Sequence, residues 1–283
     1  MNWWQAVILG IVEGVTEYLP VSSTGHLLLT QRLLKIPESE AANAFAICIQ
    51  GGAIIAVLGI FRKRVGQFFA GLLGLIGLRA PNENGVRLLR NLAVAFLPAM
   101  VLGVLLDDII EEHLMGLWPI VIAWFIGGVA ILVVDKWSSS DAPTQSRAKI
   151  SIDEMNWPMA LGIGLLQTVA MCPGTSRSLV TILGGLLVGL SLVAAVEFSF
   201  LLGVITLLAA TVFKAVKSGD ALLGQYDWLT LLMGSLAACL SALIAVRWML
   251  GFLTRHRMSI FGYYRIALAV VVCCCLYFGW ISE

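Results

Sequence analysis

The sequence predicts an all-α polytopic membrane protein: two inverted-topology repeats, with about six spanning helices and two re-entrant helical hairpins. Three observations lead to this fold class. Hydrophobic residues make up 59% of the 283 residues and charged residues 12%, whereas a soluble domain carries about 25% charged residues. Six apolar segments are long enough to cross a bilayer. Two further pairs of apolar segments are too short to cross, and they recur at matching places in the two halves of the chain.

The six segments expected to span are residues 44–61, 88–106 (with Pro98 as a kink), 117–134, 192–213, 228–250 and 260–280. The short pairs are 2–19 with 22–34, and 157–171 with 176–190. A helix of about 13 residues is only about 20 Å long, against a hydrocarbon core of about 30 Å. Each short pair is therefore predicted to be a re-entrant hairpin whose polar tip lies at mid-membrane depth, surrounded by protein or water.

An internal duplication is predicted from spacing. The segment Gly10-x-x-Glu13 precedes Pro20 as Gly164-x-x-Gln167 precedes Pro173, and Phe45 and Phe198 each follow their proline by 25 residues. We expect one integral membrane domain, 1–283. Its first repeat, 1–135, contains hairpin 2–34; a polar cytoplasmic linker covers 136–156; the second repeat, 157–283, contains hairpin 157–190. Interrupted segments at matching places point to a binding site between the halves.

The charge distribution predicts the orientation. Under this topology thirteen Lys and Arg residues, Arg265 among them, lie on one face and four on the other, with Arg177 at the second tip. The positive-inside rule makes the richer face cytoplasmic, so both termini face outward. The net charge is only +1, and no basic run suggests nucleic-acid binding.

The first tip combines carboxylates, hydroxyls and a histidine. Glu13 and Glu17 are four residues apart and share a helix face. Pro20 should end that helix, and a second helix should begin near Ser23, one turn before His26, so that the imidazole reaches the Ser23 hydroxyl. The new helix start favours an anion. Further expected phosphate ligands here are Ser22, Thr24 and Gly25.

The second tip adds a fixed positive charge. Arg177 lies in the first turn of its predicted helix, and its planar guanidinium matches phosphate oxygens. The alternative is a structural arginine bound to a carboxylate such as Glu17. The expected phosphate-binding residues around it are Gly174, Thr175, Ser176, Ser178 and Thr181.

Alternatives exist for the first tip as well. Glu13 could be a buried carboxyl satisfied by the backbone, and His26 a hydrogen-bonded interior histidine. Together, Glu13 and Glu17 could bind a divalent cation or exchange protons.

The segments Glu13–His26, Pro173–Ser178 and Phe45-x-x-x-Ile49-Gln50 resemble the bacitracin-resistance family of undecaprenyl-pyrophosphate phosphatases. The resemblance extends over nearly the whole chain. It implies inverted repeats, two re-entrant hairpins and a site open to the outer face of the bacterial inner membrane. One departure from the family pattern is Met171-Cys172 before Pro173.

The implied activity is removal of one phosphate from undecaprenyl pyrophosphate. This recycles the lipid carrier for peptidoglycan synthesis and confers bacitracin resistance, with Mg²⁺ or Ca²⁺ as cofactor. The family's two glutamates match Glu13 and Glu17, its serine Ser23, its histidine His26 and its arginine Arg177.

Two mechanisms are consistent with these residues. Either Ser23 attacks phosphorus while His26 accepts its proton, or His26 is itself the nucleophile. Arg177 would stabilise the developing charge, Glu17 would orient His26 or hold the metal, and Glu13 would assist with metal or water. The main alternative function is an inverted-repeat transporter or flippase for a lipid phosphate. A homodimer is left open.

A path for the prenyl chain is expected as well. Gly71–Gly77 and Gly184-Gly185 could line it, or could serve close helix packing instead.

Overall fold

The computed structural model describes residues 1–37, 39–78, 80, 82–140 and 150–281. Within these ranges the only β-structure is an isolated bridge between Ile150 and Leu190. The described helices that are long and apolar enough to cross a membrane number six: α3 (Glu40–Ile60), α5 (Glu83–Leu114), α6 (Leu117–Ser140), α9 (Leu192–Gln225), α10 (Trp228–Leu253) and α11 (Ser259–Tyr277). The predicted all-α polytopic fold is confirmed.

Short helices stand where the two hairpins were predicted. The first pair is α1 (Trp3–Thr16) with α2 (Ser23–Leu33), and the second is α7 (Trp157–Gln167), the 3₁₀ turn η1 (Thr168–Met171) and α8 (Arg177–Leu187). The helices α2 and α8 have 11 residues each, so each is about 16 Å long and too short to cross a bilayer.

The two tips share an unusual backbone conformation. Ser22 precedes α2 with φ 74° and ψ 100°, and Ser176 precedes α8 with φ 75° and ψ 112°. A non-glycine residue with positive φ is uncommon and costs energy, so it persists only where its surroundings impose it. The same strain at the same place in both tips supports the predicted duplication.

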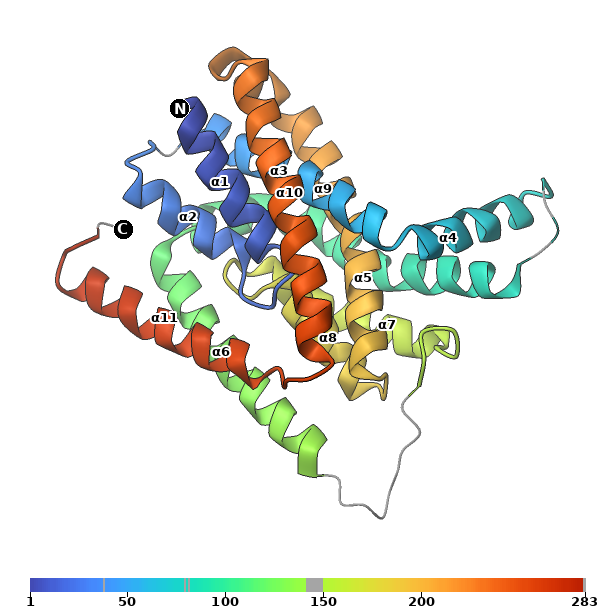
Figure 1. Cartoon of the computed structure of the whole chain (residues 1–283). Coiled ribbons are helices and arrows are strands. Elements are labelled where there is room, and N and C mark those ends of the chain that lie inside the picture. Colours follow the sequence, from blue (N-terminus) through green and yellow to red (C-terminus); the bar gives the residue numbers. More distant parts are fainter. Residues whose placement is uncertain (38, 79, 81, 141–149, 282–283) are drawn as a thin grey trace.

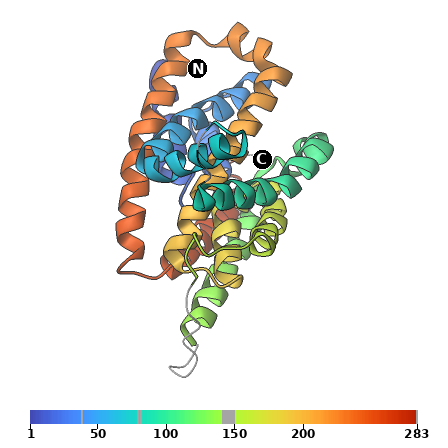
Figure 2. The same cartoon turned by 90° about the vertical axis from the view of Figure 1, so that its right-hand side faces the viewer.

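The contacts between helices show a corresponding arrangement in the two halves of the chain. The helix α1 packs along α10, and α7 packs along α5, so the first helix of each half lies on a spanning helix of the other half. Each of the pairs α3–α9 and α6–α11 joins the two halves (Figure 1). The helix α4 (Arg62–Leu75) and the start of α5 form an antiparallel hairpin that projects from the bundle, and Figure 2 turns it toward the viewer.

Glycines allow several of these helices to approach closely. A Cβ on Gly10 or Gly14 of α1 would overlap backbone atoms of α10, and one on Gly71 would overlap α5 at Gly85. A Cβ on Gly185 would lie 2.7 Å from the Ala195 Cβ. Gly71 and Gly185 therefore serve helix packing.

One predicted boundary was wrong. The predicted linker 136–156 begins too early because α6 continues to Ser140, and residues 141–149 lie outside the described part. The linker ends at Asn156, whose side chain caps α7 by accepting from the Met159 N–H at 3.1 Å. The spans predicted at 192–213 and 88–106 agree with the apolar segments Leu192–Phe213 and Glu83–Leu106, beyond which α9 continues as a helix to Gln225 and α5 to Leu114.

Candidate active site

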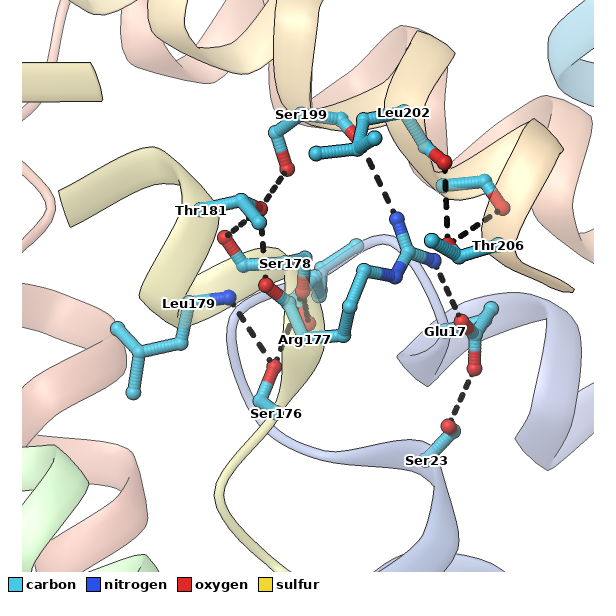
Figure 3. A network of polar contacts seen from close by, with 12 residues as sticks. Glu17, Ser23, Ser176, Arg177, Ser178, Leu179, Thr181, Ser199, Leu202 and Thr206 are labelled. Atoms are coloured by element: carbon cyan, nitrogen blue, oxygen red, sulfur yellow. Dashed lines mark hydrogen bonds and ion pairs between the residues drawn. The ribbon is translucent and has the colours of Figure 1, made fainter. Parts of the chain in front are cut away.

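The two tips meet at one carboxylate. Ser23, the first residue of α2, donates from Oγ to Glu17 Oε2 at 2.5 Å. Arg177, the first residue of α8, donates from Nη2 to Glu17 Oε1 at 2.7 Å. Figure 3 shows Glu17 between its two partners, one from each hairpin. Glu17 and Ser23 are both buried. The site predicted between the halves therefore has a serine, a carboxylate and an arginine in direct contact.

Arg177 makes further contacts with α9 and Tyr18, although its Nε has no hydrogen-bond partner among the described residues. Its Nη1 donates to the Ser199 carbonyl of α9 at 3.2 Å, and its Cζ lies 5.5 Å from the centre of the Tyr18 ring. Gly203 of α9 leaves the space that the guanidinium occupies, because a Cβ there would overlap it. The alternative that Arg177 binds Glu17 is thus confirmed as a contact. An arginine fixed beside a buried serine can also serve as an anion ligand.

The hydroxyls of the second tip are already bonded to protein. A chain of hydrogen bonds runs from the Leu179 N–H to Ser176 Oγ, on to Ser178 Oγ at 3.0 Å, and from there to the Leu19 carbonyl of the first tip at 2.9 Å. Thr181 Oγ1 lies 2.6 Å from Ser199 Oγ (Figure 3). These three side chains hold α8 to the first tip and to α9. Their predicted phosphate binding stays a prediction.

His26 does not contact Ser23, contrary to the expected serine–histidine pair. Its Nδ1 lies 2.6 Å from the Ser22 carbonyl and its Nε2 2.8 Å from the Tyr264 hydroxyl. A carbonyl only accepts, so Nδ1 carries the proton. The chain reverses between α1 and α2 through Ser22, which has a positive φ. This reversal brings Glu17, at the end of α1, to the Ser23 hydroxyl instead. The side chain that accepts a hydrogen bond from Ser23 is therefore a carboxylate and not an imidazole.

The start of α2 remains open to an anion. Ser22 is its N-cap residue but makes no side-chain capping bond, and Thr24 is exposed beside Ser23. Gly25 and Gly174 lie against α6, where a Cβ on Gly174 would come within 2.7 Å of the Ile120 Cα. Thr175 of the second tip is half-buried. Uncapped N–H groups at a helix start are typical phosphate ligands.

Glu13 lies one turn before Glu17 and is fully buried. Among the described residues neither of its Oε atoms has a hydrogen-bond partner, so the expected backbone partner is absent there. The described part has no group of three or more His, Cys, Asp or Glu side chains placed to hold a metal. A cation here would take its carboxylate ligands from Glu13 and Glu17. Carboxylates are the ligands that Mg²⁺ and Ca²⁺ prefer, and Mg²⁺ often completes its shell with substrate phosphate.

Sequence reasoning missed two residues of α11. Tyr264 bonds His26, and Arg265 is completely buried, although the charge count placed it on the cytoplasmic face. One signal could have identified Arg265: an ionisable residue inside an apolar span is expensive and usually functional.

Comparison with known proteins agrees with this geometry. The chain matches the family model described as Bacitracin resistance protein BacA over residues 6–271. Undecaprenyl-diphosphatase 2 of Rhodospirillum rubrum is 41% identical over 278 residues, 98% of this chain and 96% of that protein. The undecaprenyl-diphosphatase of Pseudomonas putida is 42% identical over 285 residues, covering 100% and 98% of the two chains. That of Methylococcus capsulatus is 40% identical over 281 residues, covering 99% and 97%. With a family match and relatives that extend over nearly its whole length, the chain belongs to the bacitracin resistance protein BacA family.

Proposed function

We propose that this protein hydrolyses undecaprenyl pyrophosphate to undecaprenyl phosphate and inorganic phosphate in the bacterial inner membrane. The reaction recycles the lipid carrier for peptidoglycan synthesis, and its excess confers bacitracin resistance. The relatives named undecaprenyl-diphosphatase support this activity. The observation that carries it is the contact of Ser23 and Arg177 with the two oxygens of Glu17. A transporter needs phosphate ligands but no nucleophile beside a base.

Ser23 is the nucleophile in this proposal. Its Oγ attacks the terminal phosphorus and its proton passes to Glu17 Oε2, 2.5 Å away. The phosphoanhydride bond breaks, its electron pair leaves with undecaprenyl phosphate, and a phosphoserine forms. Water then attacks the phosphoserine, which releases inorganic phosphate and returns the proton to Ser23. Arg177 and the open start of α2 stabilise the charge on the phosphoryl oxygens.

The divalent cation is part of the proposal. Glu13 and Glu17 would hold it, because the buried oxygens of Glu13 lack protein donors in the described part. Bound there, Mg²⁺ or Ca²⁺ would neutralise charge on the pyrophosphate.

A lateral groove supplies a place for the prenyl chain. It has a volume of about 910 Å³ and lies between α1, α10 and α11, with an almost entirely apolar wall. Its lining includes Thr16, the neighbour of Glu17 in sequence, and Tyr264, which contacts His26. Because it adjoins the catalytic residues, the groove can take the chain while the pyrophosphate reaches the tips.

Groove occupancy can be tested by chain length. Ile11→Trp fills the groove, so it should lower turnover of undecaprenyl pyrophosphate several-fold more than turnover of a short prenyl pyrophosphate. Leu232→Trp, on an exposed face of α10 outside the groove, is the matched control. Equal losses on both substrates with Ile11→Trp would place the chain elsewhere.

The activity itself is tested by phosphate release from undecaprenyl pyrophosphate, using purified protein in detergent with and without chelator. Wild type should release phosphate, whereas Ser23→Ala and Arg177→Ala should each lose about 10²-fold or more. No release by wild type with added Mg²⁺ or Ca²⁺ would overturn the proposal and favour a lipid-phosphate transporter.

The nucleophile is identified separately by trapping the phosphoenzyme. A phosphoserine is stable in acid, whereas a phosphohistidine is acid-labile. An acid-stable label that is absent from Ser23→Ala supports Ser23. An acid-labile label would assign attack to His26 instead.

A further inference from the structure

A buried arginine joins the two tips from behind. Arg265 of α11 is 0% exposed. Its Nη1 donates to the Pro20 carbonyl of the first tip at 3.3 Å, and its Nη2 donates to the Gly174 carbonyl of the second tip at 2.9 Å. The same side chain donates to two carbonyls of α6, from Nη2 to Ala123 at 2.9 Å and from Nε to Trp124 at 3.3 Å.

All of these acceptors are main-chain carbonyls. Within the described part of the chain no carboxylate forms an ion pair with Arg265. A buried charge without a counter-charge is expensive, and a hydrophobic residue of similar volume would often stabilise the fold as well or better. Fold stability alone therefore explains this arginine poorly. Its planar guanidinium donates hydrogen bonds to several acceptors at once, which an apolar packing residue cannot do.

The surrounding helices are shaped to hold this side chain. A Cβ on Gly127 of α6 would overlap the Arg265 guanidinium, and one on Gly128 would lie 2.8 Å from the Gly262 carbonyl of α11. The neighbouring Tyr264 holds His26, whose ring also lies 5.2 Å from that of Trp124. The pair α6–α11 thus forms a wall against which both tips rest.

We propose that Arg265 is a positioning residue, which fixes the two tips in register so that Arg177 of one meets Glu17 of the other. The guanidinium binds the turn three residues after Glu17 and the turn three residues before Arg177. Each catalytic side chain is therefore tied through a short segment to the same rigid group. The inference rests on the proposed hydrolysis for its kinetic consequence, but its structural consequence can be measured without substrate.

The first test replaces the guanidinium of Arg265. Arg265→Gln should lower kcat about tenfold or more while KM changes little, because phosphate ligands stay and their alignment is lost. Arg265→Lys keeps the charge but cannot reach four acceptors, so it should recover only part of the rate. Arg257→Gln, an exposed arginine shortly before α11, is the matched control and should retain wild-type kinetics.

Hydrogen exchange supplies a readout that does not depend on activity. In Arg265→Gln, amides of the segments 18–26 and 172–178 should exchange faster, while those of α3 and α9 keep wild-type protection. Unchanged exchange at both tips would overturn the proposal whatever the activity. Failure of the proposed hydrolysis would instead appear as an inactive wild type with normal tip protection.

A second perturbation leaves Arg265 in place, which matters if its variants fail to fold. Gly127→Ala should displace the guanidinium and lower kcat, whereas Gly103→Ala, whose Cβ would meet nothing within 4 Å, should not. In an Arg177→Lys background, where the register is already disturbed, Gly127→Ala should cost much less than it costs alone. Wild-type kinetics for Gly127→Ala, or additive losses in the double variant, would contradict the proposal.

Discussion

Glu17 is the residue on which the site depends, because each of its oxygens has a different partner. One accepts from Ser23, the proposed nucleophile, and the other from Arg177. A base in general acid–base catalysis contributes about 10²- to 10⁴-fold.

We predict that Glu17→Gln lowers kcat for phosphate release by about 10²-fold or more, because an amide can accept the serine hydrogen bond but not its proton. Steady-state kinetics in detergent measure this. Glu112→Gln removes a carboxylate from an exposed position of α5 and should behave as wild type. A Glu17→Gln enzyme with near-normal kcat would exclude Glu17 as the base.

Tyr264 offers a milder test of His26. Tyr264→Phe removes the hydroxyl that lies 2.8 Å from Nε2 but keeps a ring that can stack at 5.8 Å. We expect kcat to fall by about tenfold or less, since a second residue still orients His26 through Nδ1. If Tyr264→Phe costs as much as Ser23→Ala, His26 has a larger part in the chemistry than we assign.

Several of the predicted site residues lie together in the structure, but not all of their contacts were predicted. The two helices of the first hairpin and the break between them were predicted from the spacing of Glu13, Glu17, Ser23 and His26. The pairing of Ser23 with Glu17 depends on how the chain reverses through the strained Ser22, which spacing along a helix does not contain. The charge count placed Arg265 on the cytoplasmic face, and the glycines of α6 that receive its side chain lie far away in sequence.

At the scale of elements, glycine faces decide which helices can touch. Gly10 and Gly14 of α1 lie directly on the backbone of α10, and Gly52 of α3 lies on α10 at Ser235. In lipid the hydrophobic effect does not drive helices together. Small residues at such crossings allow the close van der Waals packing that stabilises the contact instead. The sequence marked these segments as apolar helices but did not say which pairs would meet, since partners such as α1 and α10 are separated by most of the chain.

We predict that Gly14→Leu destabilises the α1–α10 contact, because even a Cβ would overlap the Ala238 carbonyl and the Ser241 side chain. Overpacking of this kind costs about 1–3 kcal/mol. Thermal unfolding in detergent should show a lower midpoint than for wild type. Gly59→Leu, in α3 where a Cβ meets nothing within 4 Å, is the control; equal midpoints for the two variants would contradict close packing at Gly14.

The start of α10 supplies a pH-dependent prediction outside the membrane spans. Asp227 caps this helix by accepting from the Thr230 N–H at 3.1 Å. Hydrogen bonds from Thr230, first from its side chain and then from its backbone, hold the pKa of Asp227 below its usual value. The carboxylate form is thus favoured by folding, so the cap stabilises above the ordinary carboxyl pKa and weakens as the pH falls through the lowered one.

Asp227→Ala should therefore lower the thermal midpoint at pH about 7, and the difference from wild type should shrink toward pH about 3. Asp227→Asn keeps a capping oxygen without a titrating group, so its midpoint should stay close to that of wild type at neutral pH. A difference between wild type and Asp227→Ala that is the same at both pH values would show that the charge of Asp227 does not matter.

At the scale of the whole molecule, composition alone was enough for the class of protein. The six spans and the short helices follow from apolar length, which is a physical requirement of the bilayer. Helix ends were less predictable: α9 extends to Gln225 because polar residues continue a helix beyond the apolar core. The pairing of α3 with α9 and of α6 with α11 needed the structure, although the repeat spacing had suggested two related halves.

Orientation is the prediction that belongs to this scale. Moving buried Arg265 out of the count leaves twelve Lys and Arg residues on the predicted cytoplasmic face against four on the other. The bias persists, so both termini should face outward. In Figure 1 the start of α1 and the end of α11 lie on the same side of the molecule, away from the α4–α5 hairpin. A carboxy-terminal alkaline phosphatase fusion should therefore be active and a GFP fusion dark, and fusions after residue 140 should give the reverse. A fluorescent carboxy-terminal GFP would invert the topology and open the site to the cytoplasm, where the proposed recycling of outward-facing lipid could not occur.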